Sequence, residues 1–350
     1  MTSHMLDEIH EIPGAVARLL DEAGSEIGDA AELVRRRRPR WATIVGRGTS
    51  DHAATYARYL FESQLGLRSS LAATSTLSIY GARLDWGEGL VVAISQSGQS
   101  PDVDGYLAEA RACGALTLAI TNDPMSRLAA TAQVAIDCRA GPEVAIPATK
   151  TYVTQLVAVA ALVGGVVGME GWPTMIAKTA TQLDAVMEES EDWVERSGVV
   201  DEFSAAGRAI VLGRGHNLAT ALETALKLKE TARVFAEGYS TADFEHGPVA
   251  LVADDVPTVV FRPQGAIGRT VDKTLGRIRR QGGAYWVIGD GRAAPATDPG
   301  RPRLTLSPGP EALSPAKFAI PGLLLAEAVA RGIGLDPDAP RGLDKVTLTV

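Results

Sequence analysis

The stretch Leu90–Asp102 reads L-V-V-A-I-S-Q-S-G-Q-S-P-D. Its first five residues are apolar and predict a buried strand. A polar turn runs from Ser95 to Ser100, and Pro101 stands where a helix would begin, because proline is favoured at the first helical position. Backbone N–H groups and the helix dipole converge at such a junction and favour an anion. The stretch therefore predicts a phosphate cradle, with a serine-rich turn that binds nothing as the alternative.

The kind of phosphate follows from what this loop contains. It has no lysine and no G-x-x-x-x-G-K-[ST] spacing, so it is not the loop of nucleoside triphosphate enzymes. Hydroxyl groups without a fixed cation favour a phosphomonoester on a small molecule. We therefore expect a small phosphorylated ligand here.

A second strand-to-helix junction lies upstream. Trp41–Val45 predicts a strand, and the run Gly46–Asp51 that follows it reads G-R-G-T-S-D. This run is not a dinucleotide fingerprint, because Asp51 stands where a third small residue is needed. It nevertheless offers the hydroxyl groups of Thr49 and Ser50 at another helix start.

Composition limits the class of protein. Of 350 residues, 46% are hydrophobic and 22% charged, which is typical of a globular chain, and the net charge of −8 argues against a large nucleic-acid surface. Cys113 and Cys138 have no metal-binding spacing and indicate a reducing compartment. The N-terminus has no apolar signal core, and the apolar run Leu156–Met169 is too short and glycine-rich for a bilayer. We expect a cytoplasmic protein that binds neither nucleic acid nor membrane.

The order of expected elements predicts the fold class. Strands such as Leu116–Ile120 and Val134–Asp137 alternate with helices, which indicates an α/β fold with a doubly wound parallel sheet of flavodoxin-like type. Ligands of such sheets bind at the carboxyl ends of the strands, where both hydroxyl-rich loops lie. Residues from about 5 to 40 predict one or two helices broken at Pro13, and residues 173 to 197 predict an acidic helical connector.

The pattern then starts again. Gly46 and Gly213 are 167 residues apart, and so are Gly98 and Gly265, which indicates an internal duplication. The second copy reads V-V-F-R-P-Q-G where the first reads V-A-I-S-Q-S-G. Because the second copy has no serines in this loop, only the first half is expected to hold phosphate.

A candidate catalytic helix is expected over Ala219–Ala236. Glu223, Lys227 and Glu230 share one face at steps of four and three residues, which is either an exposed ion pair or a carboxylate held beside an ammonium for proton transfer. The residues expected on its apolar face are Ala225, Leu228, Ala232 and Phe235.

Two further residues suit acid–base or amine chemistry. His246 lies in a loop framed by glycine and proline, and histidine titrates near neutral pH. Lys345 is the one lysine in the last eleven residues.

Five motifs in this order carry a family resemblance: V-A-I-S-Q-S-G-Q-S-P-D, A-T-K-T-Y-V-T-Q-L, A-L-E-T-A-L-K-L-K-E, E-H-G-P-V-A-L and P-R-G-L-D-K. They resemble the tandem sugar isomerase (SIS) domains, in particular the isomerase half of glucosamine-6-phosphate synthase and the stand-alone aminosugar-phosphate deaminases. The similarity runs from about Thr43 onward. The expected organisation is an N-terminal helical segment (1–40), a first, phosphate-binding SIS domain (41–172), a helical connector (173–200), a second SIS domain (201–338) and a C-terminal catalytic tail (339–350).

The resemblance also implies roles for individual residues. Glu230 would move a proton between C1 and C2 of the sugar, His246 of a second subunit would open the ring, and Lys345 would lie over the ring, where the synthase can form an imine. Lys227 is the fourth catalytic residue and would position sugar oxygens together with Glu223. Substrate contacts would come from Thr49, Ser50, Ser95, Gln96, Ser97, Ser100, Ile146 and Glu223. The resemblance implies a homodimer and neither a metal nor an organic cofactor.

The expected reaction depends on which relative the chain follows. The synthase carries an N-terminal glutaminase domain with a catalytic cysteine at position 2, whereas this sequence begins Met1-Thr2-Ser3. We therefore expect the reverse reaction, in which glucosamine 6-phosphate and water give fructose 6-phosphate and ammonia.

Three alternatives stay open: a phosphosugar aldose–ketose isomerase, a fructosamine-6-phosphate deglycase, and a sugar-phosphate-binding regulator without turnover. Three departures from the family pattern bear on the choice of substrate. Gln99 and Asp243 stand where glutamate is common, and Pro147 replaces a small residue.

Overall fold

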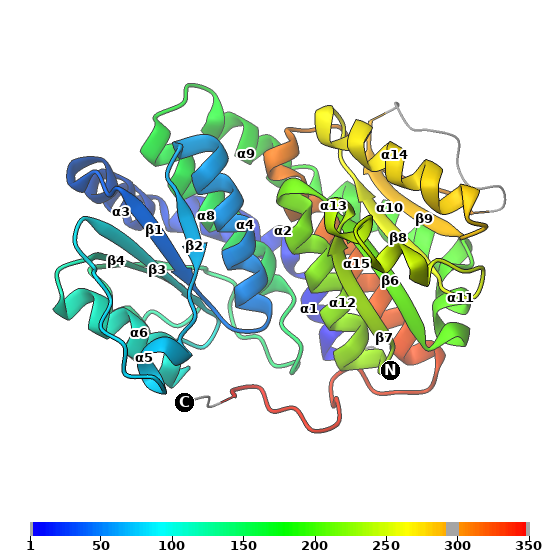
Figure 1. The fold of residues 1–350 in the computed structure, drawn as a ribbon, viewed down its shortest axis with the longest axis horizontal. Helices are drawn as coiled ribbons and strands as arrows, with labels where there is room; N and C mark the ends of the chain where they lie inside the picture. The colour runs from blue at the N-terminus through cyan, green and yellow to red at the C-terminus, as the bar shows by residue number, and fades with distance from the viewer. Residues whose placement is uncertain (1–2, 292–300, 348–350) are drawn as a thin grey trace. The chain divides into compact units, whose positions relative to one another are not determined.

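The computed structural model describes residues 3–291 and 301–347 and contains two compact units. The β1 unit comprises Glu11–Glu143, Ala148–Ala180 and Asp344–Val350. The β6 unit comprises Met1–His10, Val144–Pro147 and Thr181–Leu343. Each unit is built on one five-stranded sheet with helices packed on it (Figure 1), so each is described by itself.

The sheet of the β1 unit has the strand order β2-β1-β3-β4-β5, and every pair is parallel. The elements of this unit are α2 (Ile12–Glu22), α3 (Gly24–Arg37), β1 (Trp41–Val45), α4 (Thr49–Leu65), β2 (Ser69–Leu71), α5 (Ser75–Ser78), β3 (Gly89–Ser95), α6 (Pro101–Ala112), β4 (Leu116–Thr121), α7 (Arg127–Thr131), β5 (Val134–Asp137), α8 (Lys150–Val167) and α9 (Trp172–Ala180).

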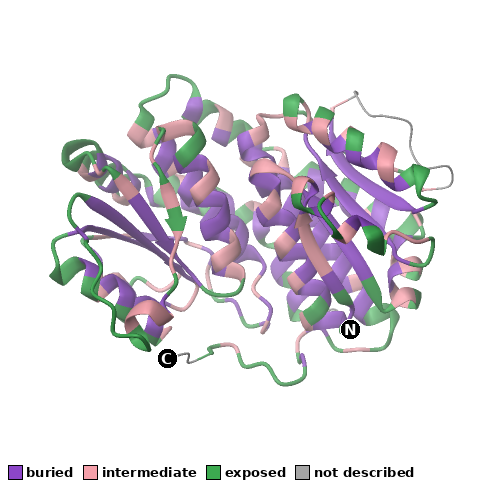
Figure 2. Ribbon diagram, viewed as in Figure 1, coloured by how far each residue is buried: buried purple, intermediate pink, exposed green. Residues whose placement is uncertain are grey.

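The two faces of this sheet are covered by different helices. Val91 and Ala93 of β3 pack with Val103 and Leu107 of α6 in one core cluster. Helix α8 packs against both α3 and α4, and α3, α4 and α8 contact β5, β1 and β4 respectively. All residues of β3 and β4 are buried (Figure 2), as expected for parallel strands covered on both faces.

The sheet of the β6 unit has the order β10-β9-β8-β6-β7 and is also parallel throughout. Its elements are α1 (His4–His10), α10 (Leu183–Arg196), α11 (Val199–Ala206), β6 (Arg208–Gly213), η1 (Gly215–Asn217), α12 (Leu218–Ala232), β7 (Phe235–Ser240), α13 (Thr241–Phe244), η2 (Pro248–Leu251), β8 (Thr258–Arg262), α14 (Ala266–Arg280), β9 (Tyr285–Asp290), β10 (Leu304–Leu306), η3 (Glu311–Leu313) and α15 (Ser314–Gly332). Helix α14 packs on one face of this sheet, and α12 and α15 contact the strands as well.

Both sheets have one topology. Read from β7, the second order is β7-β6-β8-β9-β10, which matches β2-β1-β3-β4-β5 strand for strand. This is the flavodoxin-like order, so the predicted fold class is confirmed, and the duplication suggested by the two glycine pairs is confirmed by topology. The sequence boundaries of the individual domains stay predictions.

The paired glycines Gly46 and Gly213 serve one purpose in both sheets. A Cβ added to Gly46 would lie 2.5 Å from the backbone oxygen of Ser50, and one added to Gly213 would collide with the backbone oxygen of Asn217. In both cases the blocking oxygen belongs to the residue four positions after the glycine, in the segment that begins the helix. Glycine therefore lets a helix start directly against the end of a strand.

Two sequence predictions about helices are wrong. The N-terminal segment forms three helices, α1, α2 and α3, with breaks near Glu11 and Ala23. Pro13 does not break a helix but lies in the first turn of α2, where proline needs no N–H partner. The helix expected to reach Ala236 ends at Ala232, because Arg233 takes a left-handed conformation. Phe235 consequently begins β7 and is 71% exposed, so it is not on the apolar face of the helix.

Two helices of the described chain are long and apolar enough, by length and composition alone, to cross a membrane. They span Lys150–Val167 and Glu311–Gly332, and 78% and 89% of an apolar 18-residue window in each are buried inside the structure. Burial of this extent is typical of core helices, so the test gives only weak evidence for a membrane span. The cytoplasmic location stays a prediction.

The strand-to-helix junction generates a stability prediction. We expect Gly46→Ala to lower the free energy of unfolding by about 1–3 kcal/mol, because the new Cβ would meet backbone that cannot move aside freely. Urea denaturation followed by circular dichroism measures the change. Gly28→Ala is the matched control: Gly28 is exposed within α3, has no atom within 4 Å of its added Cβ, and should gain up to about 1 kcal/mol. Equal effects of the two substitutions would contradict the steric argument.

Candidate functional site

The two hydroxyl-rich loops lie at one edge of the β1 sheet. β1 and β3 are neighbours in the sheet and run parallel, so the loops that follow them leave from the same carboxyl edge. The helices that follow, α4 and α6, pack against different partners on the two faces. This is the point of a doubly wound sheet at which ligands bind.

The serine loop has a shape fixed by its own hydrogen bonds. The Ser95 hydroxyl accepts a hydrogen bond from the Gly98 N–H at 3.1 Å, and the Ser97 hydroxyl accepts one from the Gln99 N–H at 3.3 Å. Gly98 has a φ of 62°, and an added Cβ there would collide with the Ser126 side chain. Only glycine fits this turn, so its conformation is set before any ligand arrives.

The end of this loop presents the N-terminus of α6. Ser100 is the N-cap residue, but its side chain makes no capping hydrogen bond, so the first N–H groups of the helix are not taken up by it. The carboxylate of Asp102 in the first turn is buried and paired with Arg47, whose Nε donates to it at 2.7 Å. Because Arg47 neutralises Asp102, the helix terminus keeps its attraction for an anion.

The other predicted phosphate contacts belong to the same unit. Thr49 begins α4, and Ser50 is buried with its hydroxyl accepting a hydrogen bond from the Gln155 side chain of α8 at 3.2 Å. Gln96 follows Ser95 in the loop, and its backbone oxygen accepts the Asn122 N–H at 3.1 Å. The structure therefore gathers all six residues predicted to contact phosphate at the carboxyl edge of the β1 sheet.

The equivalent loop of the β6 unit is built differently. Arg262 occupies the position that is 167 residues from Ser95, and its guanidinium donates two hydrogen bonds of 2.7 Å to Asp272. Arg262 is 3% exposed, so a buried ion pair stands at the position that the serine loop has in the first copy. This agrees with the expectation that only the first half holds phosphate, which stays a prediction.

Lys345 has a partner that sequence reasoning missed. Its ammonium lies 3.1 Å from the carboxylate of Glu143, whose side chain is fully buried. The other carboxylate oxygen accepts the N–H groups of Thr149 and Thr151 at 2.9 and 3.0 Å, which caps the N-terminus of α8. One carboxylate thus fixes both the start of a core helix and the lysine of the tail. The signal that the sequence offered for this contact was Glu143 itself, which lies six residues before Thr149, the N-cap residue of α8.

Ile146 belongs to the β6 unit, in the short segment Val144–Pro147. Glu8 of α1 is buried, and its carboxylate accepts hydrogen bonds from the N–H groups of Val144 and Ala145. The carboxylate therefore holds the backbone just before Ile146, which is itself half-buried. Nothing in the local sequence connects Glu8 with residues 136 positions away.

Three charged residues of α12 form a buried cluster. The Lys227 ammonium lies 2.5 Å from Glu230 and 3.4 Å from Glu223. The side chains of Lys227 and Glu223 are 1% and 2% exposed, whereas that of Glu230 is 20% exposed. The common face was predicted from spacing, but an exposed ion pair, the simpler alternative, does not fit this burial.

The electrostatics of the cluster are dominated by two opposing effects. Burial alone would lower the pKa of Lys227, but the carboxylates of Glu223 and Glu230 outweigh it and raise the pKa above the ordinary 10.5. Lys227 is therefore an ammonium at neutral pH. The cluster presents Glu230 to solvent as a carboxylate held from behind by a fixed cation.

His246 lies in the turn between α13 and η2, where Gly247 has a φ of 146°. It is exposed, and its ring makes no hydrogen bond to any residue of the described chain. The structure thus places Ile146, Glu223, Lys227, Glu230 and His246 in the β6 unit. Lys345 and the phosphate loops belong to the β1 unit.

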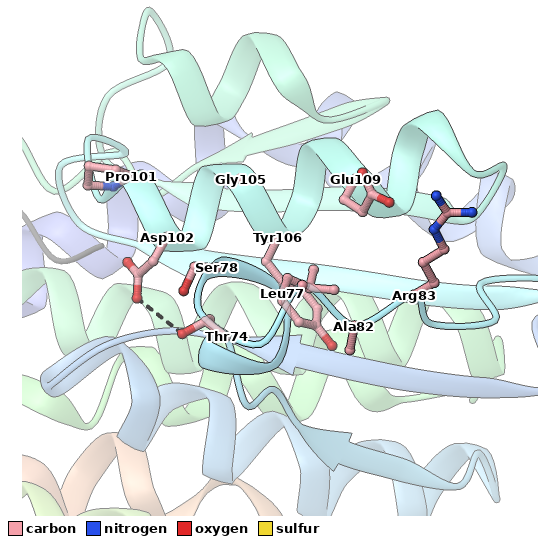
Figure 3. Close-up of a pocket in the computed structure, with 11 residues that line it drawn as sticks. Thr74, Leu77, Ser78, Ala82, Arg83, Pro101, Asp102, Gly105, Tyr106 and Glu109 are labelled. Atoms are coloured by element: carbon pink, nitrogen blue, oxygen red, sulfur yellow. Dashed lines mark hydrogen bonds between the residues drawn. The ribbon is translucent and has the colours of Figure 1, made fainter.

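A cavity of about 500 Å³ lies beside α6, and Asp102 forms part of its wall. Figure 3 shows Asp102, Tyr106 and Glu109 of α6 facing Leu77 and Arg83 across it, with Asp102 bonded to Thr74. No residue predicted to contact substrate lines this cavity. Its walls explain instead how α6 is held: Asp102 ties the helix to the segment after β2.

Within residues 3–291 and 301–347, no group of three or more His, Cys, Asp or Glu is placed to hold a metal ion. Cys113 is exposed and Cys138 is buried, and neither forms a disulfide.

Comparison with known proteins identifies the family to which this chain belongs. The SIS domain model matches residues 38–164 and 202–322, one match to each sheet. The chain therefore belongs to the SIS domain family, as its motifs indicated.

Two curated relatives match nearly the whole of this chain. The chain is 33% identical over 363 residues to the glutamine–fructose-6-phosphate aminotransferase (isomerizing) of Gloeobacter violaceus and 35% identical over 350 residues to that of Methanothermobacter thermautotrophicus. Each match covers 97% of this chain, which spans 58% and 56% of the two relatives.

Among solved structures, a protein of Silicibacter pomeroyi provisionally named a phosphosugar isomerase is 34% identical with a TM-score of 0.87, over 96% of this chain and 100% of that one. The glucosamine-6-phosphate deaminase of Thermotoga maritima is 22% identical with a TM-score of 0.74, covering 96% of this chain and 100% of that one, and shows the shared fold alone.

The buried cluster of α12 generates a second stability prediction. We expect Lys227→Met to lower the free energy of unfolding at neutral pH by about 3–5 kcal/mol, because it leaves the buried carboxylate of Glu223 without its cation. Urea denaturation measures the loss. Adding Glu223→Gln to this variant should recover part of it, since the uncompensated charge is then removed.

The control and the pH dependence make this prediction specific. Arg196→Met breaks an exposed i,i+4 ion pair with Asp192 and should change stability by less than about 0.5 kcal/mol. Since the pKa of Lys227 is raised in the folded protein, its contribution is fully present below the ordinary lysine pKa and is lost as the pH rises through the raised value. A Lys227→Met variant as stable as the Arg196→Met variant would show that the cluster contributes nothing.

Proposed function

We propose that this protein acts on phosphosugars and that it hydrolyses glucosamine 6-phosphate to fructose 6-phosphate and ammonia. The observation that carries the proposal is the α12 cluster, in which Glu230 is partly exposed and held by the buried ammonium of Lys227. A carboxylate fixed in this way suits a base that carries a proton between adjacent carbons. The two relatives described above are named glutamine–fructose-6-phosphate aminotransferase (isomerizing), and the fructose 6-phosphate and amino transfer in that name support the same chemistry.

The proposed reaction assigns a step to each group. His246 opens the pyranose ring by proton transfer at the ring oxygen. Glu230 then removes the proton from C2 and returns it to C1, which converts the C1 aldehyde with its C2 amine into a C2 imine. Glu223 holds the ammonium of Lys227, and this ammonium fixes the carboxylate of Glu230 during the transfer. Water adds to C2, the C–N bond breaks, and ammonia leaves.

The phosphate would bind at the carboxyl edge of the β1 sheet. The fixed loop from Ser95 to Ser100 offers hydroxyl groups and leads into the N-terminus of α6, which Ser100 leaves without a side-chain cap, and α4 adds Thr49 and Ser50. The pairing of Arg47 with Asp102 supports this role, because it removes a negative charge from the first turn of α6. Binding through hydroxyls and backbone suits a phosphomonoester.

Lys345 would contact the open-chain form of the sugar, and Glu143 would position the ammonium of Lys345. The buried carboxylate of Glu143 holds the ammonium at 3.1 Å and is itself fixed by two N–H groups of α8. Glu143 therefore sets the direction from which the lysine approaches. Glu230, His246 and Lys345 together supply acid, base and amine chemistry. A regulator that only binds a sugar phosphate would not need all three groups, so their presence argues against that alternative.

The decisive experiment measures ammonia released from glucosamine 6-phosphate, with fructose 6-phosphate assayed in parallel. We expect equal amounts of both products from the native protein. Glu230→Gln should lower kcat by about 100-fold or more, since the amide cannot accept the proton, while the Kd for glucosamine 6-phosphate changes little. Glu195→Gln, at an exposed site on α10, is the matched control and should leave both constants at the native values.

Other outcomes would assign a different reaction or none. An aldose–ketose conversion without ammonia would leave a phosphosugar isomerase and overturn the deaminase. Binding of the sugar phosphate with no turnover would leave a regulator. A Glu230→Gln variant that keeps most of the native rate would remove Glu230 from its proposed role.

We also propose that the protein is a homodimer in which His246 serves the site of the partner subunit. The exposure of its ring and the lack of a hydrogen-bond partner in the described chain support this arrangement. We expect a dimer by light scattering. A mixture of Glu230→Gln and His246→Asn subunits, each inactive alone, should recover about a quarter of native activity, because half of the dimers formed by random pairing have one intact site.

The alternative arrangements give different results in the same mixture. If His246 acted within its own chain, no mixed dimer would contain an intact site and the mixture would stay inactive. A fully active monomer would contradict the dimer itself.

A further inference from the structure

The cavity beside α6 has no part in the proposed reaction, yet it has the features of a small-molecule site. Its volume is about 500 Å³, and pockets for small ligands commonly have about 300–1,000 Å³. Leu77, Ala82 and the buried ring of Tyr106 give it an apolar wall, and polar side chains complete the lining. An apolar body with a few polar groups is typical of a pocket that binds and orients a ligand.

An interior glycine keeps this cavity open. Gly105 lies in the middle of α6 and lines the cavity, and no atom lies within 4 Å of a Cβ added there. Gly105 has no positive φ, so its backbone conformation does not require glycine. Glycine inside a helix is less stable than alanine. Neither sterics nor conformation therefore explains this glycine, and its consequence is an empty space in front of α6.

The two ends of the cavity carry different polar groups. Figure 3 shows Asp102 and Thr74 at one end and Arg83 and Glu109 at the other. The Asp102 carboxylate is buried, pairs with Arg47 and accepts the Thr74 hydroxyl at 3.2 Å. The end with Asp102 therefore offers a ligand little net charge.

The end with Arg83 and Glu109 presents one unpaired charge of each sign. Both residues are exposed, and they come from different segments, the loop after α5 and helix α6. Within residues 3–291 and 301–347, neither forms an ion pair, and the Glu109 carboxylate accepts a weak hydrogen bond from the Cys113 thiol at 3.7 Å. A cation and an anion that stand on opposite walls without pairing suit a ligand that carries both charges.

We propose that this cavity is an effector site for a free α-amino acid with an apolar or aromatic side chain. The ligand carboxylate would pair with Arg83, whose guanidinium presents paired N–H donors to it, and the ligand ammonium would pair with Glu109. The ligand side chain would lie along Leu77 and Tyr106 toward Thr74. The binding of the amino acid is independent of the reaction proposed above, whereas its effect on the phosphosugar rests on the proposed function.

Asp102 joins this cavity to the candidate phosphate site within the same unit. Its carboxylate is held by Thr74 on the cavity wall and by Arg47, which comes from the loop that leads to Thr49 and Ser50. Asp102 lies in the first turn of α6, so its neutralisation by Arg47 favours an anion at this helix N-terminus. A ligand packed against Thr74 and α6 would hold this arrangement in place. We therefore expect it to tighten the binding of a phosphosugar.

Calorimetry with L-phenylalanine and three analogues tests the site. 3-Phenylpropionate lacks the ammonium, phenethylamine lacks the carboxylate, and glycine lacks the apolar side chain. We expect a Kd of about 1 mM or lower for L-phenylalanine and at least about tenfold weaker binding of each analogue. Equal affinity for L-phenylalanine and the two singly charged analogues would overturn the site for a zwitterion. Absence of binding by all four would overturn the site as a whole.

A side chain placed at Gly105 tests the location of the site. Gly105→Leu should weaken the binding of L-phenylalanine by at least about tenfold, because the leucine takes the place of the ligand. Gly28→Leu is the matched control and should keep the native Kd: Gly28 also lies exposed inside a helix, with no atom within 4 Å of its added Cβ. A native Kd in the Gly105→Leu variant would overturn the location.

A second variant acts on the charged end and leaves α6 unchanged. Arg83→Gln should lower the preference for L-phenylalanine over phenethylamine by about fivefold or more, because only the first ligand has a carboxylate. This variant keeps the test valid if Gly105→Leu fails to fold. An unchanged preference would remove Arg83 from the site.

The effect on the phosphosugar is measured as linkage between the two ligands. In the Glu230→Gln variant, which should bind without turnover, we expect saturating L-phenylalanine to lower the Kd for glucosamine 6-phosphate by about fivefold. Glucosamine 6-phosphate must then lower the Kd for L-phenylalanine by the same factor. Adding Thr74→Val removes the hydrogen bond to Asp102 and should bring this factor to about one, with less than about threefold change in the Kd for L-phenylalanine alone.

The outcomes separate this inference from the proposed function. Binding of L-phenylalanine with an unchanged or higher Kd for glucosamine 6-phosphate would overturn the effector role and keep the amino acid site. An amino acid site in a protein that binds no phosphosugar would overturn the proposed function and the coupling with it. Release of ammonia from glucosamine 6-phosphate without any binding of L-phenylalanine would overturn this inference and leave the proposed function in place.

Discussion

The close approach of helix to strand at Gly46 and Gly213 is the constraint on which both halves of this protein depend. A Cβ at either position would meet backbone of the segment that begins the next helix, at Ser50 or Asn217. The contact brings a helix N-terminus to the carboxyl end of the sheet, where its N–H groups face outward. In the first half this edge also carries the serine loop. The location of the candidate phosphate site is therefore a consequence of how the helix is attached to the strand.

Divergence of the two copies is visible at residues that are 167 positions apart. Ser95 corresponds to Arg262, which is buried and closed by Asp272, so the second edge is filled by an internal ion pair. Lys150 and Lys317 also correspond, and both are buried at the start of the long helix of their unit. Each meets a different carboxylate, Glu11 at 2.6 Å or Asp290 at 3.9 Å. The duplicated frame was kept while the charges at its edges were rearranged.

Sequence pattern predicted the strands β1, β3, β4 and β5 of the first sheet, because buried parallel strands are continuous apolar runs, as in Leu90–Ile94. It also placed Glu223, Lys227 and Glu230 on one face, since helical spacing alone determines that. It failed at Arg233, where the helix ends on an arginine and no glycine or proline marks the stop. Local pattern also cannot reveal partners far apart in the chain, such as Glu143 with Lys345, which are separated by 202 positions. Those contacts depend on how the elements pack.

The buried ion pair of α12 is better explained by geometry than by stability. A buried pair must offset the loss of hydration of both charges, and replacing it with apolar residues is often neutral or stabilising. Glu223 and Lys227 are almost completely inaccessible, so they pay this cost in full, whereas Glu230 keeps a solvent-exposed edge. Glu223 fixes the ammonium of Lys227, and this ammonium in turn fixes the partly exposed carboxylate of Glu230. The role proposed for Glu230, a base that reaches two adjacent carbons, would require such a fixed position, because proton transfer is sensitive to small displacements.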